Sequence, residues 1–168
     1  MPRRRLFALL ASAGMLAALA ATPEAVGAAG GGDSASGNVN FVSSQVDFSA
    51  KSTNTGTNAS GRIRYTNTST DPNLVYTADV VCLEVTGATA TTPASAVVVG
   101  RITSQPAGQT AESIIVNATD WGKFAQQPDG LFAFPSSAPA PPQDTCPAPF
   151  GFVNLVADGR VTIENTLP

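Results

Sequence analysis

The sequence of 168 residues contains no histidine, and this absence excludes several kinds of chemistry. A Ser-His-Asp or Cys-His nucleophile needs an imidazole with a pKa near neutrality, so neither arrangement can be built from this chain. A histidine pH switch is excluded for the same reason. Zinc sites usually draw on histidine as well. From the sequence we therefore assign no catalytic residue and expect neither a metal site nor a cofactor.

Charged residues are scarce, at 12% of the chain, and their balance is acidic. The net charge of the whole chain is −3, and three of its nine basic residues are Arg3, Arg4 and Arg5. The rest of the chain is therefore more acidic than the total. An acidic domain repels phosphate backbones and anionic membrane surfaces, so we expect no nucleic-acid partner.

The first 28 residues have the order of a bacterial secretory signal peptide. A cationic start is followed by an uncharged apolar run over 6–21, which is short for a membrane span, and then by small residues over 22–28. This order predicts a secreted, extracellular protein cleaved after Ala28 or after Ala20. Arg4-Arg5 resembles part of a twin-arginine signal, but an ordinary cationic start is the simpler interpretation. No second apolar run is long enough for a transmembrane segment.

Only two cysteines occur, Cys82 and Cys146. An even pair in an exported protein normally forms a disulfide. A redox-active dithiol usually needs Cys-x-x-Cys spacing, and these two residues are far apart in the chain. We predict a structural disulfide that pins the segment around Cys146 to the strand that carries Cys82.

Apolar and polar residues alternate with a period of two along most of residues 38–168, which is typical of half-buried strands. No segment beyond the signal peptide keeps helical spacing over three turns. Eight to nine short strands, mostly joined by short loops, predict an antiparallel all-β fold with meander connections, either a β-sandwich or a small barrel. The longest predicted strand is 75–85, with Val81, Leu83 and Val85 on one face and Val80 and Cys82 on the other.

Three local patterns sharpen this prediction. Residues 29–37 are rich in glycine and small polar residues, which predicts a flexible leader before a single β domain over 38–168. A phase change in the alternation predicts a bulge or tight bend over 42–45. Asp158-Gly159 suits a type I′ turn, which predicts a terminal hairpin within 153–163.

Paired carboxylates are the catalytic arrangement that this composition leaves open, because glycoside hydrolysis needs two acids and no histidine. Most acids lie in predicted turns or on polar strand faces. Asp79 and Glu84 share the long strand, but their odd separation predicts opposite faces. A carboxylate-based glycoside hydrolase is therefore the alternative function.

The candidate binding residues are Trp121, Lys123 and Phe124, a loop segment with the only tryptophan. Exposed aromatics commonly anchor a sugar or a protein, whereas a core tryptophan closing one end of the fold is the competing interpretation. Residues 135–149 are rich in proline, which predicts an extended surface loop that cannot pair as an inner strand. We interpret this loop as a tethered crossover between sheets, with a partner-binding segment as the alternative.

Four short motifs follow one another along residues 80–132. They are Val80-Val81-Cys82-Leu83-Glu84-Val85-Thr86-Gly87, Val97-Val98-Val99-Gly100-Arg101-Ile102, Asp120-Trp121-Gly122 and Pro128-Asp129-Gly130-Leu131-Phe132. They resemble a group of small exported actinobacterial β-proteins. This group has no assigned activity, so the resemblance implies the exported all-β character and no site residues. The function we predict is a non-catalytic binding or cell-surface-associated module, with a cell-envelope glycan or protein as its partner.

Overall fold

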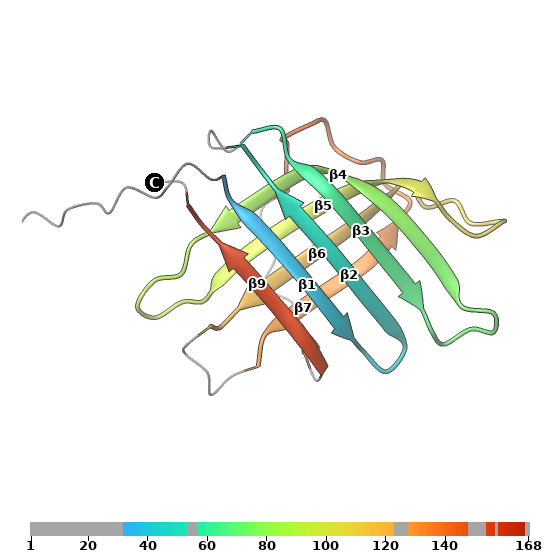
Figure 1. Cartoon of the computed structure of the whole chain (residues 1–168). Coiled ribbons are helices and arrows are strands. Elements are labelled where there is room, and N and C mark those ends of the chain that lie inside the picture. Colours follow the sequence, from blue (N-terminus) through green and yellow to red (C-terminus); the bar gives the residue numbers. More distant parts are fainter. Residues whose placement is uncertain (1–31, 54–56, 123–127, 148–153, 157, 167–168) are drawn as a thin grey trace, which may run out of the picture.

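The computed structural model describes residues 32–53, 57–122, 128–147, 154–156 and 158–166 (Figure 1). The predicted signal peptide lies outside the described residues. Within them the chain forms strands and no helix, which confirms the all-β prediction. The described residues therefore include no helix long and apolar enough to cross a membrane. The strands are β1 (Ser34–Asn40), β2 (Ser44–Lys51), β3 (Ser60–Asn67), β4 (Leu74–Thr86), β5 (Ala94–Ser104), β6 (Ser113–Asp120), β7 (Gly130–Ser136), β8 (Asn154–Leu155) and β9 (Asp158–Glu164).

All nine described strands belong to one antiparallel sheet with the order β8-β7-β6-β5-β4-β3-β2-β1-β9. Strands β1 to β8 follow one another as a meander, as predicted, and β9 returns to pair with β1. The sheet curls into a half-barrel, so that β9, β1, β2 and β3 cross the layer of β5, β6 and β7 (Figure 1). The hydrogen bonds therefore join one curled sheet and not two separate ones.

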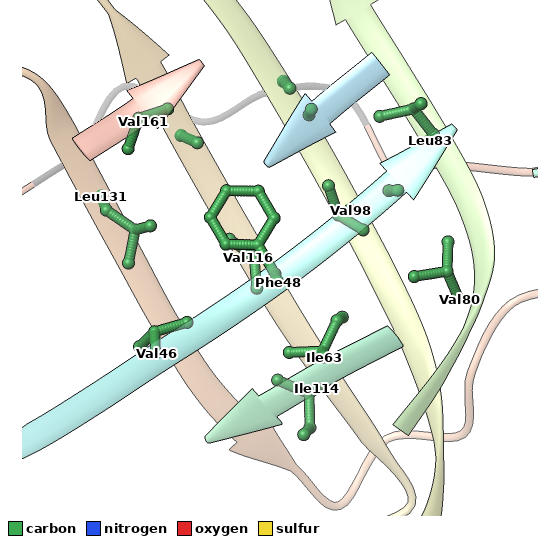
Figure 2. Packing of buried hydrophobic residues seen from close by; sticks show 14 of the residues in the cluster. Val46, Phe48, Ile63, Val80, Leu83, Val98, Ile114, Val116, Leu131 and Val161 are labelled. Carbon is green, nitrogen blue, oxygen red and sulfur yellow. The ribbon is translucent and has the colours of Figure 1, made fainter. Parts of the chain in front are cut away.

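The main core fills the inside of this curl. Phe48 of β2 lies at its centre, close to Val116 of β6, with Ile63 and Ile114 on one side (Figure 2). Each of these side chains is at most 2% exposed. Burying an apolar side chain of this size contributes about 1.5–3 kcal/mol to folding, so the facing halves of the sheet stabilise each other.

Strand β4 contains an irregularity that the sequence pattern did not predict. The β4–β5 register shifts between Val80 and Cys82. As a result Val80 and Leu83 both contact the main core, while Cys82 faces the other side of the sheet. The prediction that Val80 and Cys82 share the face opposite Leu83 is therefore wrong, because one extra residue reverses the alternation along the strand.

The start of β1 corrects the predicted leader. This strand begins at Ser34, inside the 29–37 segment, and Ala35 is fully buried. A Cβ atom at Gly37 would lie 2.6 Å from Cε1 of Phe48. The glycine is therefore needed to seat the central aromatic ring, and composition alone made it resemble a flexible segment. The predicted tight bend after β1 is confirmed, since the Phe41 N–H donates to the Ser44 carbonyl at 2.7 Å.

The predicted terminal hairpin is wrong. Asp158 and Gly159 are part of β9 and pair with Asn40 and Val39 of β1, while the short β8 pairs with β7. Gly159 has a φ of 119°, and a Cβ atom there would clash with the Asn38 carbonyl oxygen. The glycine thus allows close approach to β1, and the same dipeptide that favours a turn serves a strand pairing instead.

Residues 137–147, which we call the proline strap, cover the outer face of the central strands. The Ser113 hydroxyl donates to the Ala138 carbonyl at 2.8 Å, and the Asp144 N–H donates to the Val81 carbonyl at 3.0 Å. Cys146 and Cys82 are brought to disulfide distance, as predicted, with their Cα atoms 5.5 Å apart. Cys146 packs on an outer apolar cluster formed by Cys82, Val97, Val99 and Ile115.

The strap explains why β5 and β6 are apolar on both faces, and it is tethered at Cys146 as predicted. The predicted crossover between sheets is wrong, because the strands before and after this loop, β7 and β8, are antiparallel neighbours in one sheet. Its predicted start at Pro135 needs correction, because β7 extends to Ser136 and Pro135 pairs with Ile114. Strand β8 pairs only with Gly130 and Leu131, so the proline lies at a sheet edge of the described residues, where its missing N–H breaks no ladder bond.

Candidate ligand cleft at the open end of the sheet

Asp79 and Glu84, the two acids weighed for catalysis, lie on the same outer face and not on opposite faces. The register shift in β4 falls between them and reverses the alternation. Both side chains are exposed, and Asp79 Oδ1 lies 3.8 Å from Nε of the exposed Arg62. An exposed ion pair of this kind contributes at most about 1 kcal/mol. No group of three potential metal-binding acids or cysteines occurs among the described residues.

Two other carboxylates hold β9 against the opposite half of the sheet. Asp129 accepts hydrogen bonds from the backbone N–H groups of Trp121 at 3.2 Å and Val161 at 3.1 Å. Asp120 accepts from those of Gly122 at 2.7 Å and Ile163 at 3.0 Å. The N–H groups of β9 that point away from β1 thus meet side-chain oxygens instead of another strand. We call this junction the carboxylate seam.

Asp144 performs a similar task for the proline strap. Its carboxylate accepts hydrogen bonds from the backbone N–H groups of Asn58 at 2.8 Å and Ala59 at 2.9 Å. The N–H group of Ala59, and to a lesser extent that of Asn58, holds the pKa of the Asp144 carboxyl below its ordinary value. Gln143 completes the anchor by donating to the Ala59 carbonyl at 2.8 Å. The strap is therefore tied to the segment before β3 as well as to Cys82.

Trp121, the anchor predicted from the sequence, is half-buried at the end of β6. Lys123 and Phe124, the other two predicted binding residues, lie outside the described residues. The strap begins at the other end of the sheet, since Ser136 pairs with Ser113 at the start of β6. Binding at Trp121 stays a prediction.

A cleft of about 300 Å³ opens at that other end of the sheet, and the sequence analysis did not predict it. Tyr65 near the end of β3 and Tyr76 near the start of β4 are cross-strand partners, and their rings meet edge to face with centroids 6.1 Å apart. The loop 105–112 and the end of β7 complete the walls. The polar lining consists of Tyr65, Asn67, Tyr76, Gln109, Thr110 and Ser137.

Gln109 is exposed but is held in place. The Tyr76 hydroxyl donates to Gln109 Oε1 at 3.0 Å, and the Gln109 backbone N–H donates to the Pro106 carbonyl at 3.2 Å. Gly108 supports this turn with a φ of 81°, a value that favours glycine. The Gln109 amide nitrogen has no acceptor among the described residues, so its two N–H groups are available at the cleft.

Three hydroxyls of the cleft are also uncommitted. The hydroxyls of Tyr65, Thr110 and Ser137 have no hydrogen-bond partner among the described residues, whereas Asn67 uses its oxygen to accept from the N–H and hydroxyl of Ser69. Among the described residues, no charged side chain lines the cleft. The groups that do line it can bind a ligand through neutral hydrogen bonds.

The sequence gives little signal for this cleft because its walls come from four separated segments. The only local clue is one tyrosine in each of two successive strands, and a pairing register is needed to place them side by side. Comparisons of the chain with models of protein families, with curated proteins and with solved structures find no match.

Proposed function

We propose that this chain is an exported binding module, with no catalytic activity, whose ligand occupies the cleft between Tyr65, Tyr76 and Gln109. The observation that carries this proposal is how the polar groups are distributed. The carboxylates at the seam and in the strap are occupied by backbone N–H groups. The hydroxyls of Tyr65, Thr110 and Ser137 and the amide nitrogen of Gln109, in contrast, have no hydrogen-bond partner among the described residues. Groups left unpaired at a concave site are the ones that a ligand can satisfy.

Export is supported by the signal-like order of residues 1–28 and by the pair of cysteines at disulfide distance. The resemblance to small exported actinobacterial β-proteins agrees with it. Mass spectrometry of the protein secreted by a bacterial host should find a new N-terminus between Ala21 and Ser34. Recovery of the uncleaved chain in the membrane fraction would contradict export.

The glycoside hydrolase alternative receives less support. That reaction needs two carboxyl groups facing each other across a substrate cleft, about 5–10 Å apart. Asp79 and Glu84 share a face, but both are exposed on one strand, and the cleft itself is lined by neutral groups. We therefore favour binding over hydrolysis.

The test is retention on cell-envelope material from the bacterial host. The purified mature protein should sediment with isolated envelopes, and Gln109→Ala should weaken this retention about tenfold. Gln105→Ala is the matched control, because Gln105 is exposed in the same loop but lies outside the cleft lining. Release of reducing sugar from the same envelopes would instead favour the hydrolase, and absence of any retention would reject the binding module.

A further inference from the structure

The geometry points to a specific class of ligand for this cleft: an uncharged, hydroxyl-bearing ring of the size of one sugar residue, presented as a unit of a neutral glycan. This inference rests on the proposed binding function and adds the chemical identity of the ligand. Three observations lead to it, namely the size of the cleft, the character of its hydrogen-bonding groups and the preorganisation of Gln109.

The size of the cleft limits the ligand. Its volume of about 300 Å³ lies at the lower end of the range of about 300–1,000 Å³ for pockets that bind small molecules. A protein partner would need a far larger buried area for stable association. A single ring, free or at the end of a chain, fits such a volume, and the open side of the cleft leaves room for the rest of a glycan to continue into solvent.

The hydrogen-bonding groups match hydroxyls better than ions. Hydroxyls such as those of Tyr65, Thr110 and Ser137 both donate and accept, and the Gln109 amide nitrogen donates. A carboxylate or phosphate ligand would call for a cationic partner, and none of the described residues that line the cleft is cationic. The tyrosine rings, together with Pro135, add apolar surface that can pack against the C–H groups of a sugar ring.

Preorganisation favours affinity at this position. The side chain of an exposed glutamine is ordinarily free to rotate, and ordering it on binding lowers affinity. The bond from the Tyr76 hydroxyl fixes Gln109 Oε1, so the amide nitrogen is already directed before a ligand arrives. Tyr76 is 6% exposed and therefore cannot itself turn outward. We infer that Tyr76 positions Gln109, and that Gln109 makes the ligand contact.

The experiment is binding of the mature protein to an array of neutral oligosaccharides with terminal glucose, galactose, mannose or arabinose. Sulfated and uronic-acid oligosaccharides are printed beside them. We expect retention on at least one neutral glycan, weakened about tenfold by Gln109→Ala and about fivefold by Tyr76→Phe. Gln105→Ala should bind like the wild type. Melting temperatures of all variants, measured by circular dichroism, separate loss of binding from loss of fold.

The outcomes distinguish this inference from the proposed function. Retention only on acidic glycans, or envelope binding that needs Gln109 without any retention on the array, would overturn the neutral-glycan inference and leave a binding module in place. Binding that is lost in a folded Trp121→Ala variant but kept in Gln109→Ala would move the site to the opposite end of β6. Failure to bind either the envelope or the array would reject both proposals.

Discussion

Replacing Asp129 by alanine should destabilise the protein strongly, because this one carboxylate joins two distant parts of the chain. It accepts hydrogen bonds from the N–H groups of Trp121 and Val161. A hydrogen bond to a charged acceptor contributes about 1.5–3 kcal/mol, so two such bonds give an upper range of about 3–6 kcal/mol. Asp129 is only half-buried, and water can partly replace it. We therefore expect a loss of about 3 kcal/mol in the free energy of unfolding.

The assay is equilibrium unfolding in urea at pH 7, with hydrogen exchange of the Val161 amide as a local readout. Asp158→Ala is the matched control. Asp158 lies on β9, the strand that Asp129 holds, but it is exposed and, among the described residues, accepts only from the Asn40 amide at 3.1 Å. Its loss should therefore cost at most about 0.5 kcal/mol. If Asp129→Ala and Asp158→Ala unfold at the same urea concentration, the carboxylate seam does not hold β9 and the reasoning is refuted.

Three further predictions follow from other features. Replacing Cys82 and Cys146 together by alanine should lower the free energy of unfolding in urea by roughly 4 kcal/mol, because the disulfide spans 64 positions. Two alkylatable thiols in the native wild-type protein would contradict the disulfide. Hydrogen bonds lower the pKa of Asp144 in the folded protein, so the ionised carboxylate stabilises the fold. This stabilisation is complete above the ordinary pKa of 3.8 and is lost as pH falls through the lower pKa of the folded state. The difference in melting temperature between wild type and Asp144→Asn should thus stay constant from about pH 5 to 7 and shrink below pH 3.8, and a difference that grows on acidification would be inconsistent with this. Gly159→Ala should lower the free energy of unfolding by about 3 kcal/mol or more, because the new Cβ atom would clash with β1. Gly108 has open space around it, so Gly108→Ala should cost only about 1 kcal/mol for its positive φ. Equal losses in the two variants would rule out the close approach at Gly159.

The strands were predictable because each of them buries one face. The alternation around Phe48 and Ile63 is regular, and both residues occupy the core as the period of two requires. The alternation failed in β4, where an extra residue between Val80 and Cys82 changes the phase without changing the local composition. It failed again at Gly159, because a glycine that permits a turn and a glycine that permits close strand contact look the same in a sequence.

The cysteine pair was predictable from inventory and context, since two cysteines allow one intramolecular pairing. The cleft was not, because it depends on the side-by-side position of Tyr65 and Tyr76 and on a contact from Gln109, 33 positions further along the chain than Tyr76. The sequence directed attention to Trp121 instead, because a single tryptophan is conspicuous and a tyrosine on a strand is not. Long-range pairing determines such sites, and local patterns carry little information about it.

The pairing of β9 with β1 has a consequence for how the chain acquires its structure. Synthesis proceeds from the N-terminus, so β1 and β2 can form a hairpin early, while the other edge of β1 has to wait for the last described strand. Until then the N–H and C=O groups of that edge are open to any extended segment of another chain. A shortened protein that ends before Asp158 should therefore self-associate rather than remain a folded monomer. Pairing with β9 therefore protects an edge of β1 that a shorter chain would leave exposed.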